Sequence, residues 1–208
     1  MTPEALAKIK KYFEDIPSQP VPPAVDMAEP AHTAERTAQI EDSFARLPRI
    51  DIVYKTVPAN TPDWYALDML GDILFGGPSS RLYQLLVKEK AVALQVGGGI
   101  DQRRGTSLFQ AIAMMKPGQD AGEVEKLIAE EFERVKKDGV TPAEMNKVRI
   151  QDRLGQAESL TSTINRARMM GRFAVFFHDP ALINTILANY SEVTPADIQR
   201  VARQYLEP

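Results

Sequence analysis

The sequence comprises 208 residues, of which 44% are hydrophobic and 25% charged, so a chain disordered throughout is excluded and one large or two small domains are expected. The 25 basic and 28 acidic residues give a net charge of −3, which offers no general electrostatic attraction for nucleic acid. Cysteine is absent, which excludes disulfides, thiolate metal sites and cysteine nucleophiles, and no apolar run is long enough for a membrane span.

The chain begins with a helix pattern and continues into a proline-rich stretch. A Thr-Pro pair at the start predicts a helix over 3–13, because threonine caps helices well and proline is tolerated at the first helical position. Residues 17–35 are predicted to be an extended linker, since their five prolines cannot continue a helix or a central strand. We therefore expect residues 1–16 to be the terminal helix of a preceding domain, and residues 36–208 to form the main domain.

The main domain is predicted to contain strands first and helices afterwards. The last predicted strand is apolar on both faces, as a central strand covered twice would be. The long helix over 142–177 is expected to break near Gly155 or Gly171. Strands are expected over 37–43, 50–57, 94–100 and 106–115, and helices over 62–75, 81–90, 120–138, 142–177, 180–189 and 195–206. This order predicts an α+β fold, in which helices pack on one face of a largely antiparallel sheet.

The two histidines do not suggest a catalytic or metal site. His32 begins His-Thr-Ala-Glu-Arg, which differs from the His-x-x-Glu-His zinc motif by an arginine that cannot bind zinc. It also lies within the predicted linker, shortly after Pro30, so the helix that would hold two ligands on one face is missing. His178 lies at a predicted helix end, where a structural role is favoured. We therefore predict no catalytic residue and no metal ligand in this chain.

Two glycine-rich segments remain as candidates for a binding site. Neither fits the phosphate-binding loop, which needs Gly-Lys-Ser/Thr at the start of a helix. The three glycines from Gly97 lie within a strand pattern, where glycine marks either a bulge or the close approach of another backbone. A bound extended peptide is one such backbone. The candidate substrate-binding residues are therefore Leu94, Gln95, Val96, Gly97, Gly98, Gly99 and Ile100.

Three segments carry a resemblance to a known family. From Gly76 the chain reads Gly-Gly-Pro-Ser-Ser-Arg-Leu-Tyr-Gln-Leu-Leu-Val-Lys-Glu-Lys. Lys-Tyr-Phe-Glu-Asp-Ile-Pro precedes the linker from Lys11, and Thr-Pro-Ala-Glu from Thr141 precedes the long helix. This ordered set resembles the C-terminal, non-catalytic domain of the M16 (pitrilysin-type) zinc metallopeptidases, especially bacterial members akin to mitochondrial processing peptidase. The motif residues, for which we expect a structural role, are Gly76, Gly77, Ser79, Ser80, Arg81, Leu82 and Tyr83.

The resemblance implies a function for the protein that contains this domain. In this family two such domains form a half-shell, and two half-shells enclose a chamber for unfolded peptides. Zinc is bound by an N-terminal domain, so the expected partners are that missing domain and an unfolded peptide, with no cofactor in this chain. We expect the chain alone to be inactive and the parent to be a zinc metalloendopeptidase of the bacterial periplasm or cytoplasm.

One departure from the family pattern concerns substrate contacts. Many members carry an arginine after this motif and a tyrosine seven residues later, which together contact the substrate across the chamber from the zinc. The matching positions here are Val87 and Leu94, which cannot form these hydrogen bonds. The resemblance therefore implies that a separate partner subunit supplies the Arg/Tyr pair.

Three interpretations stay open at this point. The parent protein is a zinc peptidase, or it is an inactive M16-like structural or chaperone-like subunit without zinc. In the third interpretation the chain is a free-standing binding module. The helix before the linker argues against the third. An isolated half of a shell also exposes apolar surface, so we expect the chain to self-associate or to have limited solubility.

Overall fold

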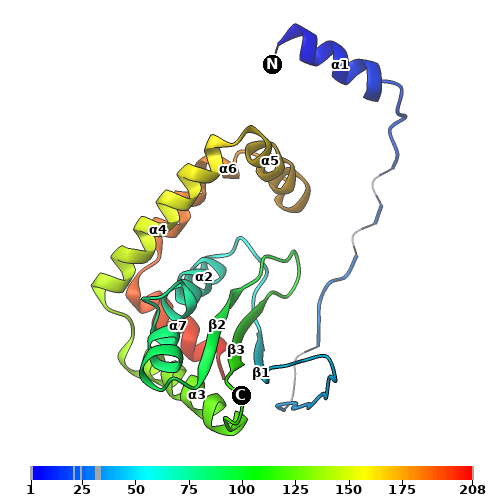
Figure 1. Cartoon of the computed structure of the whole chain (residues 1–208). Coiled ribbons are helices and arrows are strands. Elements are labelled where there is room, and N and C mark those ends of the chain that lie inside the picture. Colours follow the sequence, from blue (N-terminus) through cyan, green and yellow to red (C-terminus); the bar gives the residue numbers. More distant parts are fainter. Residues whose placement is uncertain (1, 21, 24, 31–33, 208) are drawn as a thin grey trace.

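A three-stranded antiparallel sheet lies at the centre of the body in the computed structural model, which describes residues 2–20, 22–23, 25–30 and 34–207 (Figure 1). The strands are β1 (Arg49–Lys55), β2 (Ala93–Ile100) and β3 (Leu108–Met115), in the order β1-β3-β2. Both pairings are antiparallel, so β3 is central and β1 and β2 are the edges. The predictions of an antiparallel sheet and of a central last strand are therefore confirmed.

The two faces of the sheet differ in burial, because side chains alternate along each strand. On β3 the residues of one face are buried, whereas those of the other face are only partly buried. The expectation that this strand is covered on both faces is therefore wrong. We call the partly buried side the open face of the sheet, and its residues on β3 are Leu108, Gln110, Ile112 and Met114.

The other face is covered by helices that form the core with it. Helix α2 (Pro62–Phe75) packs along β2, and α3 (Ala121–Asp138) packs against β3. Helix α7 (Pro195–Tyr205) packs on both helices. Phe109 of β3 and Phe132 of α3 meet with their ring centroids 6.3 Å apart at the centre of this core. The predicted α+β fold with helices on one face is confirmed.

Three helices form a projection that we call the arm. They are α4 (Pro142–Thr161), α5 (Thr163–Phe177) and α6 (Leu182–Glu192), and the arm extends away from the sheet (Figure 1). The break between α4 and α5 falls at Ser162, not at Gly155 or Gly171. Ser162 has an extended backbone, and its hydroxyl accepts a hydrogen bond from the N–H of Asn165, which caps α5. The break is therefore made by a capping residue.

The helix predicted over 81–90 adopts an unexpected form. Residues Tyr83–Glu89 form a π-helix, η1, in which the N–H of Lys90 reaches back to the carbonyl of Leu85. Short π-helical turns are uncommon and are often found near functional sites. Here η1 leads directly into the edge strand β2.

The N-terminal helix stands apart from the body. Helix α1 (Pro3–Phe13) has the predicted bounds and no buried residue (Figure 1). The described residues of the linker meet the body near the end of β1, where Lys55 forms an ion pair of 2.8 Å with Glu29. The strand predicted over 37–43 is absent, since this segment is exposed throughout and has no strand to pair with. Of the helices described, none is long and apolar enough to cross a membrane.

Candidate functional site

Strand β2, the candidate peptide-binding strand, lies at an edge of the sheet. It pairs with β3 on one side, and no other strand of the described chain pairs with its outer side. An edge strand presents free N–H and C=O groups to which an extended peptide can add as a further strand. The candidate segment, residues 94–100, therefore lies where an extended peptide could pair with its outer side.

The glycines of β2 are explained first by contacts within the chain. A Cβ atom on Gly71 of α2 would lie 2.8 Å from the Cα of Gly99. A Cβ atom on Gly98 would lie 2.7 Å from the ring of Phe75 and would also overlap the carbonyl oxygen of Gln110. The backbone that closely approaches Gly99 is therefore that of α2, whereas Gly98 is confined by the ring of Phe75 and by the backbone of β3. At Gly97, in contrast, a Cβ atom would meet nothing within 4 Å.

The bulge in β2 lies before the glycines. The register shifts between Ala93 and Gln95, which leaves Leu94 as the extra residue of the edge strand, whereas the three glycines pair regularly with β3. The suggestion that the glycines themselves mark a bulge is thus wrong. Leu94 is 50% exposed, as expected for a residue that a bulge turns away from the ladder.

The two positions matched to the family's Arg/Tyr pair have different surroundings. Val87 lies in η1 and packs partly against the core. Leu94 lies exposed at the bulge of β2. Neither side chain can donate or accept a hydrogen bond. The side chains at these two positions can therefore offer a peptide only apolar contact.

The sequence did not single out the open face beside this edge. The partly buried residues of β3 alternate with fully buried ones, and the polar Gln110 is one of the partly buried residues. A polar residue inside an otherwise apolar strand was the available signal of an exposed face. The open face and the outer edge of β2 together form a surface that combines apolar side chains with free backbone groups.

The glycine-rich motif builds the turn between α2 and η1. The N–H of Gly76 bonds to the carbonyl of Asp72 at the end of α2, and Gly77 adopts a φ of +81°. Ser80 is buried and donates its hydroxyl hydrogen to the carbonyl of Gly77 at 2.7 Å. Leu82 is buried in the core, Tyr83 packs against it, and Ser79 lies at the surface of this turn. These contacts support a structural role for the motif.

Arg81 is the motif residue with the most extensive contacts. Its guanidinium donates to both carboxylate oxygens of Glu144, to Glu131 at 3.3 Å and to the carbonyl of Gly139 at 3.2 Å. The hydrogen bond from Arg81, with further bonds from Thr141, lowers the pKa of Glu144 to about 2. Arg81 thereby links the motif turn to α3 and to the start of α4.

No metal or catalytic constellation emerges from these residues. In the parts of the chain that the structure describes, no three His, Cys, Asp or Glu side chains are placed to hold a metal ion. His178 ends α5 with a left-handed backbone, and His32 lies outside the described residues. The donor groups of the described residues therefore do not fit a zinc site.

Comparison with known proteins agrees with an α+β domain of this kind. The family described as Peptidase M16 inactive domain matches residues 2–151, so the chain belongs to this family, as the resemblance predicted. A relative, the zinc protease PqqE of Helicobacter pylori, is 28% identical over 200 residues, which cover 95% of this chain and 45% of the relative.

Two solved structures show the same fold. The crystal structure of a protease from Helicobacter pylori superposes with a TM-score of 0.90 at 26% identity, over 100% of this chain and 50% of that one. An inactive peptidase domain from Bordetella parapertussis superposes with a TM-score of 0.69 at 24% identity, over 77% of this chain and 84% of its own. The chain thus spans about half the length of the Helicobacter proteins it matches.

Proposed function

We propose that the chain is the non-catalytic, peptide-holding domain of an M16-type zinc endopeptidase, with its outer β2 edge and the open face forming part of the chamber wall. The observation that carries this proposal is the position of β2 at a sheet edge in a member of the inactive-domain family. An unfolded peptide would pair by its backbone along β2. Zinc would be bound by another domain, and no residue of this chain would take part in the hydrolytic step.

Two partners follow from this proposal. An N-terminal M16 domain would lie against α1 and the arm, because both present exposed apolar side chains. A separate subunit would supply the Arg/Tyr pair, because Val87 and Leu94 cannot form the hydrogen bonds of that pair. The compartment stays a prediction of bacterial periplasm or cytoplasm.

Binding of an unfolded peptide tests the role of the β2 edge. The measurement is the affinity of the 208-residue chain for a fluorescent, electrically neutral, unfolded peptide. Leu94→Lys places a charge on the outer edge strand, where charged side chains discourage strand addition. We expect this variant to bind the peptide about tenfold more weakly, a loss of about 1.4 kcal/mol.

Val53 is a matched control for the strand edge, since it is also 50% exposed and pairs with Gln110 of the open face but lies on the opposite edge strand, β1. Val53→Lys should leave the affinity within about twofold of the original, a change below 0.5 kcal/mol. Equal losses in both variants, or no binding by the original chain, would rule out the β2 edge as the peptide site.

A further inference from the structure

Three aspartates and a tyrosine meet where the arm joins the body. Asp68 and Asp72 lie one turn apart on α2, and Asp152 lies on α4, which packs against α2. Tyr190 of α6 donates its hydroxyl hydrogen to Asp68 at 2.5 Å. We call these four residues the acidic seam, and they come from the three helices that connect the arm to the body.

Neutral hydrogen bonds run beside the acidic seam. Asn189 of α6 donates to the hydroxyl of Tyr65 on α2 at 3.0 Å, and Tyr65 donates to Asn60 at 2.5 Å. These bonds contain no titratable carboxyl group. They provide a connection between α6 and α2 that persists when the aspartates change charge, so any loosening of the seam should be local.

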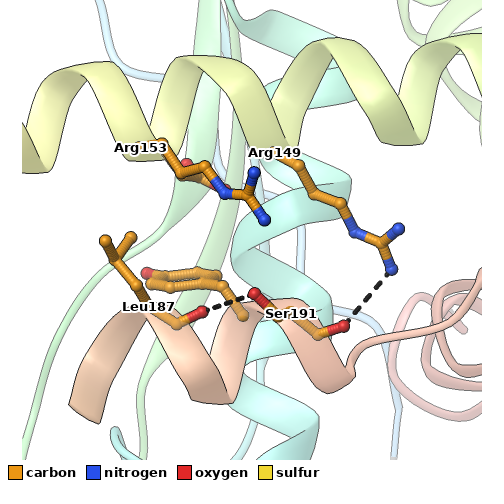
Figure 2. Close-up of a pocket in the computed structure, with 6 residues that line it drawn as sticks. Arg149, Arg153, Leu187 and Ser191 are labelled. Carbon is orange, nitrogen blue, oxygen red and sulfur yellow. Dashed lines mark hydrogen bonds between the residues drawn. The ribbon is translucent and has the colours of Figure 1, made fainter.

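A cavity of about 10 Å³, roughly the size of one water molecule, lies between α4 and α6 (Figure 2). Among the described residues, three side-chain atoms are buried without a hydrogen-bond partner, namely Asp152 Oδ2, Arg149 Nε and Gln156 Nε2. Figure 2 shows Arg149 directed to the backbone of α6, where its Nη2 donates to the carbonyls of Ser191 at 3.4 Å and Val193 at 2.7 Å. One oxygen of the Asp152 carboxylate therefore lacks a donor that would stabilise a negative charge.

The groups that act on the seam favour its protonated form. Burial, followed by the charges of Asp72 and Asp68, raises the pKa of Asp152 to about 7. Burial raises the pKa of Asp68 to about 6, although the hydrogen bond from Tyr190 acts in the opposite direction. Burial also raises the pKa of Asp72, and the positive charge of Lys147 partly offsets this increase. The other charged or titratable residues of these packed helices are Asp63 and Tyr65 on α2, Glu144, Arg149, Arg153 and Glu158 on α4, Arg166, Arg168 and Arg172 on α5 with His178 at its end, and Glu192 on α6.

We propose that the acidic seam is a pH-sensitive clasp, which holds the arm on the body when Asp152 and Asp68 are protonated and loosens it when they ionise. A proton on Asp152 removes its repulsion with the α2 aspartates and gives the carboxyl group a hydrogen to donate. Ionisation instead leaves three like charges between packed helices. Because α4 and α6 form the length of the arm, the clasp sets how firmly the arm is held.

The sign of the effect follows from the raised pKa values. A carboxyl whose pKa is higher in the folded than in the unfolded chain binds its proton more tightly when folded. Its stabilising contribution is therefore complete below the unfolded value, near pH 4, and is lost as the pH rises through the folded values of about 6 and about 7. Between pH 5 and pH 8, the arm should therefore be held most firmly at pH 5 and least firmly at pH 8.

Hydrogen–deuterium exchange of the 208-residue chain tests the clasp. Exchange is followed from pH 5 to pH 8, with each rate corrected for the pH dependence of intrinsic amide exchange. Amides of α6 and of residues 149–156 should open about tenfold more often at pH 8 than at pH 5. Amides of α3, which packs against β3 and α7, are the internal reference and should change by less than about twofold. A flat profile for α6, or an equal change in α3, would overturn the proposal.

Variants assign the effect to particular groups. Asp152→Asn should reduce the tenfold change to about twofold, whereas Glu158→Gln, on an exposed site of α4, should leave it intact. Tyr190→Phe removes the hydrogen bond that lowers the pKa of Asp68, so it should move the opening transition to higher pH. Circular dichroism establishes that each variant is folded. If Asp152→Asn does not fold, Tyr190→Phe decides, and an unshifted transition in it would overturn the proposal.

Discussion

Arg81 binds Glu144 through a two-pronged ion pair, in which Nε donates to Oε1 at 2.6 Å and Nη2 donates to Oε2 at 2.8 Å. The same carboxylate accepts hydrogen bonds from the backbone and hydroxyl of Thr141, which caps α4. A residue of the motif turn is thereby joined to the first turn of a helix 63 positions further along the chain. This planar, paired geometry is one that arginine provides and lysine does not.

Removal of Arg81 should destabilise the domain substantially. Arg81→Ala leaves Glu131, whose side chain is only 5% exposed, without one of its cationic partners, and leaves Glu144 without its guanidinium. We expect a loss of about 2–3 kcal/mol in the free energy of unfolding, below the range for a fully buried pair because Arg81 is partly exposed. Arg81→Lys should recover only part of this loss. Urea denaturation measures each value.

Arg49 offers a matched control for this experiment. It also forms a two-pronged pair, with Asp51, but on the exposed side of an edge strand. Arg49→Ala should therefore leave the free energy of unfolding nearly unchanged, since exposed ion pairs contribute little. Equal effects of the two alanine variants would contradict the structural role assigned to Arg81.

The stability of the folded chain should also fall at acidic pH, for a separate reason. The hydrogen bonds to Glu144 lower its pKa from 4.5 to about 2, and hydrogen bonds from Arg200 and Thr194 lower the pKa values of Asp63 and Asp197 respectively. The stabilising contribution of a carboxyl with a lowered pKa is complete above its unfolded value and is lost as the pH falls toward the folded one. For Glu144 this window runs from about pH 4.5 down to about pH 2.

Thermal denaturation between pH 2 and pH 8 should therefore show a maximum near pH 5, because the acidic seam contributes with the opposite sign at higher pH. Glu144→Gln should flatten the acidic limb and leave the alkaline limb unchanged. A curve that rises steadily to pH 8 would contradict the two opposing contributions.

The contact of α2 with β2 predicts opposite changes in stability when two helical glycines, Gly155 and Gly71, are each replaced by alanine. Alanine is favoured over glycine by about 1 kcal/mol within a helix, so Gly155→Ala, on an open surface of α4, should stabilise the chain. Gly71→Ala should instead destabilise it by about 1–3 kcal/mol, because the added methyl group meets the backbone of Gly99. Stabilisation by both substitutions, measured by urea denaturation, would show that α2 can move off β2 at little cost.

Self-association should follow from the apolar side chains that the chain exposes. Ile150 and Leu154 lie one turn apart on the surface of α4, and Leu6 and Phe13 are exposed on α1. Because such side chains are normally covered, light scattering at high concentration should report species larger than a monomer. Replacing Ile150 and Leu154 by lysine together should lower the mean mass, whereas a monomeric original chain would contradict the prediction.

Local signals in the sequence were sufficient for most helices. The Thr-Pro pairs correctly predicted the bounds of α1 and α2, since capping by threonine and proline at the first helical position act over a few residues. The break after α4 was predicted at a glycine but falls at Ser162, where the cap of the next helix begins. Ser162 caps its helix as the threonines do, but no proline follows it, so the sequence pattern did not predict a helix start there.

Features that depend on contacts between distant parts of the chain were harder to predict from the sequence. The strand predicted over 37–43 does not form, because strand formation requires a neighbour that a local pattern cannot reveal. The glycines of β2 were correctly placed in a strand, but the close neighbour of Gly99 is Gly71, on a helix that lies far away in the sequence. The acidic seam draws on three helices, and its only sequence signal was a pair of aspartates one turn apart on the apolar helix α2.

Zinc content and peptidase activity, measured side by side on the full-length gene product and on the 208-residue chain, test the proposal that this domain belongs to a zinc peptidase. We expect about one zinc ion per full-length molecule, as in zinc peptidases with a single catalytic metal. We also expect chelator-sensitive cleavage of an unfolded peptide when the partner subunit is present, and neither property in the 208-residue chain. Cleavage by this chain alone, or a full-length product that binds no zinc and cleaves no peptide with its partner present, would contradict this proposal.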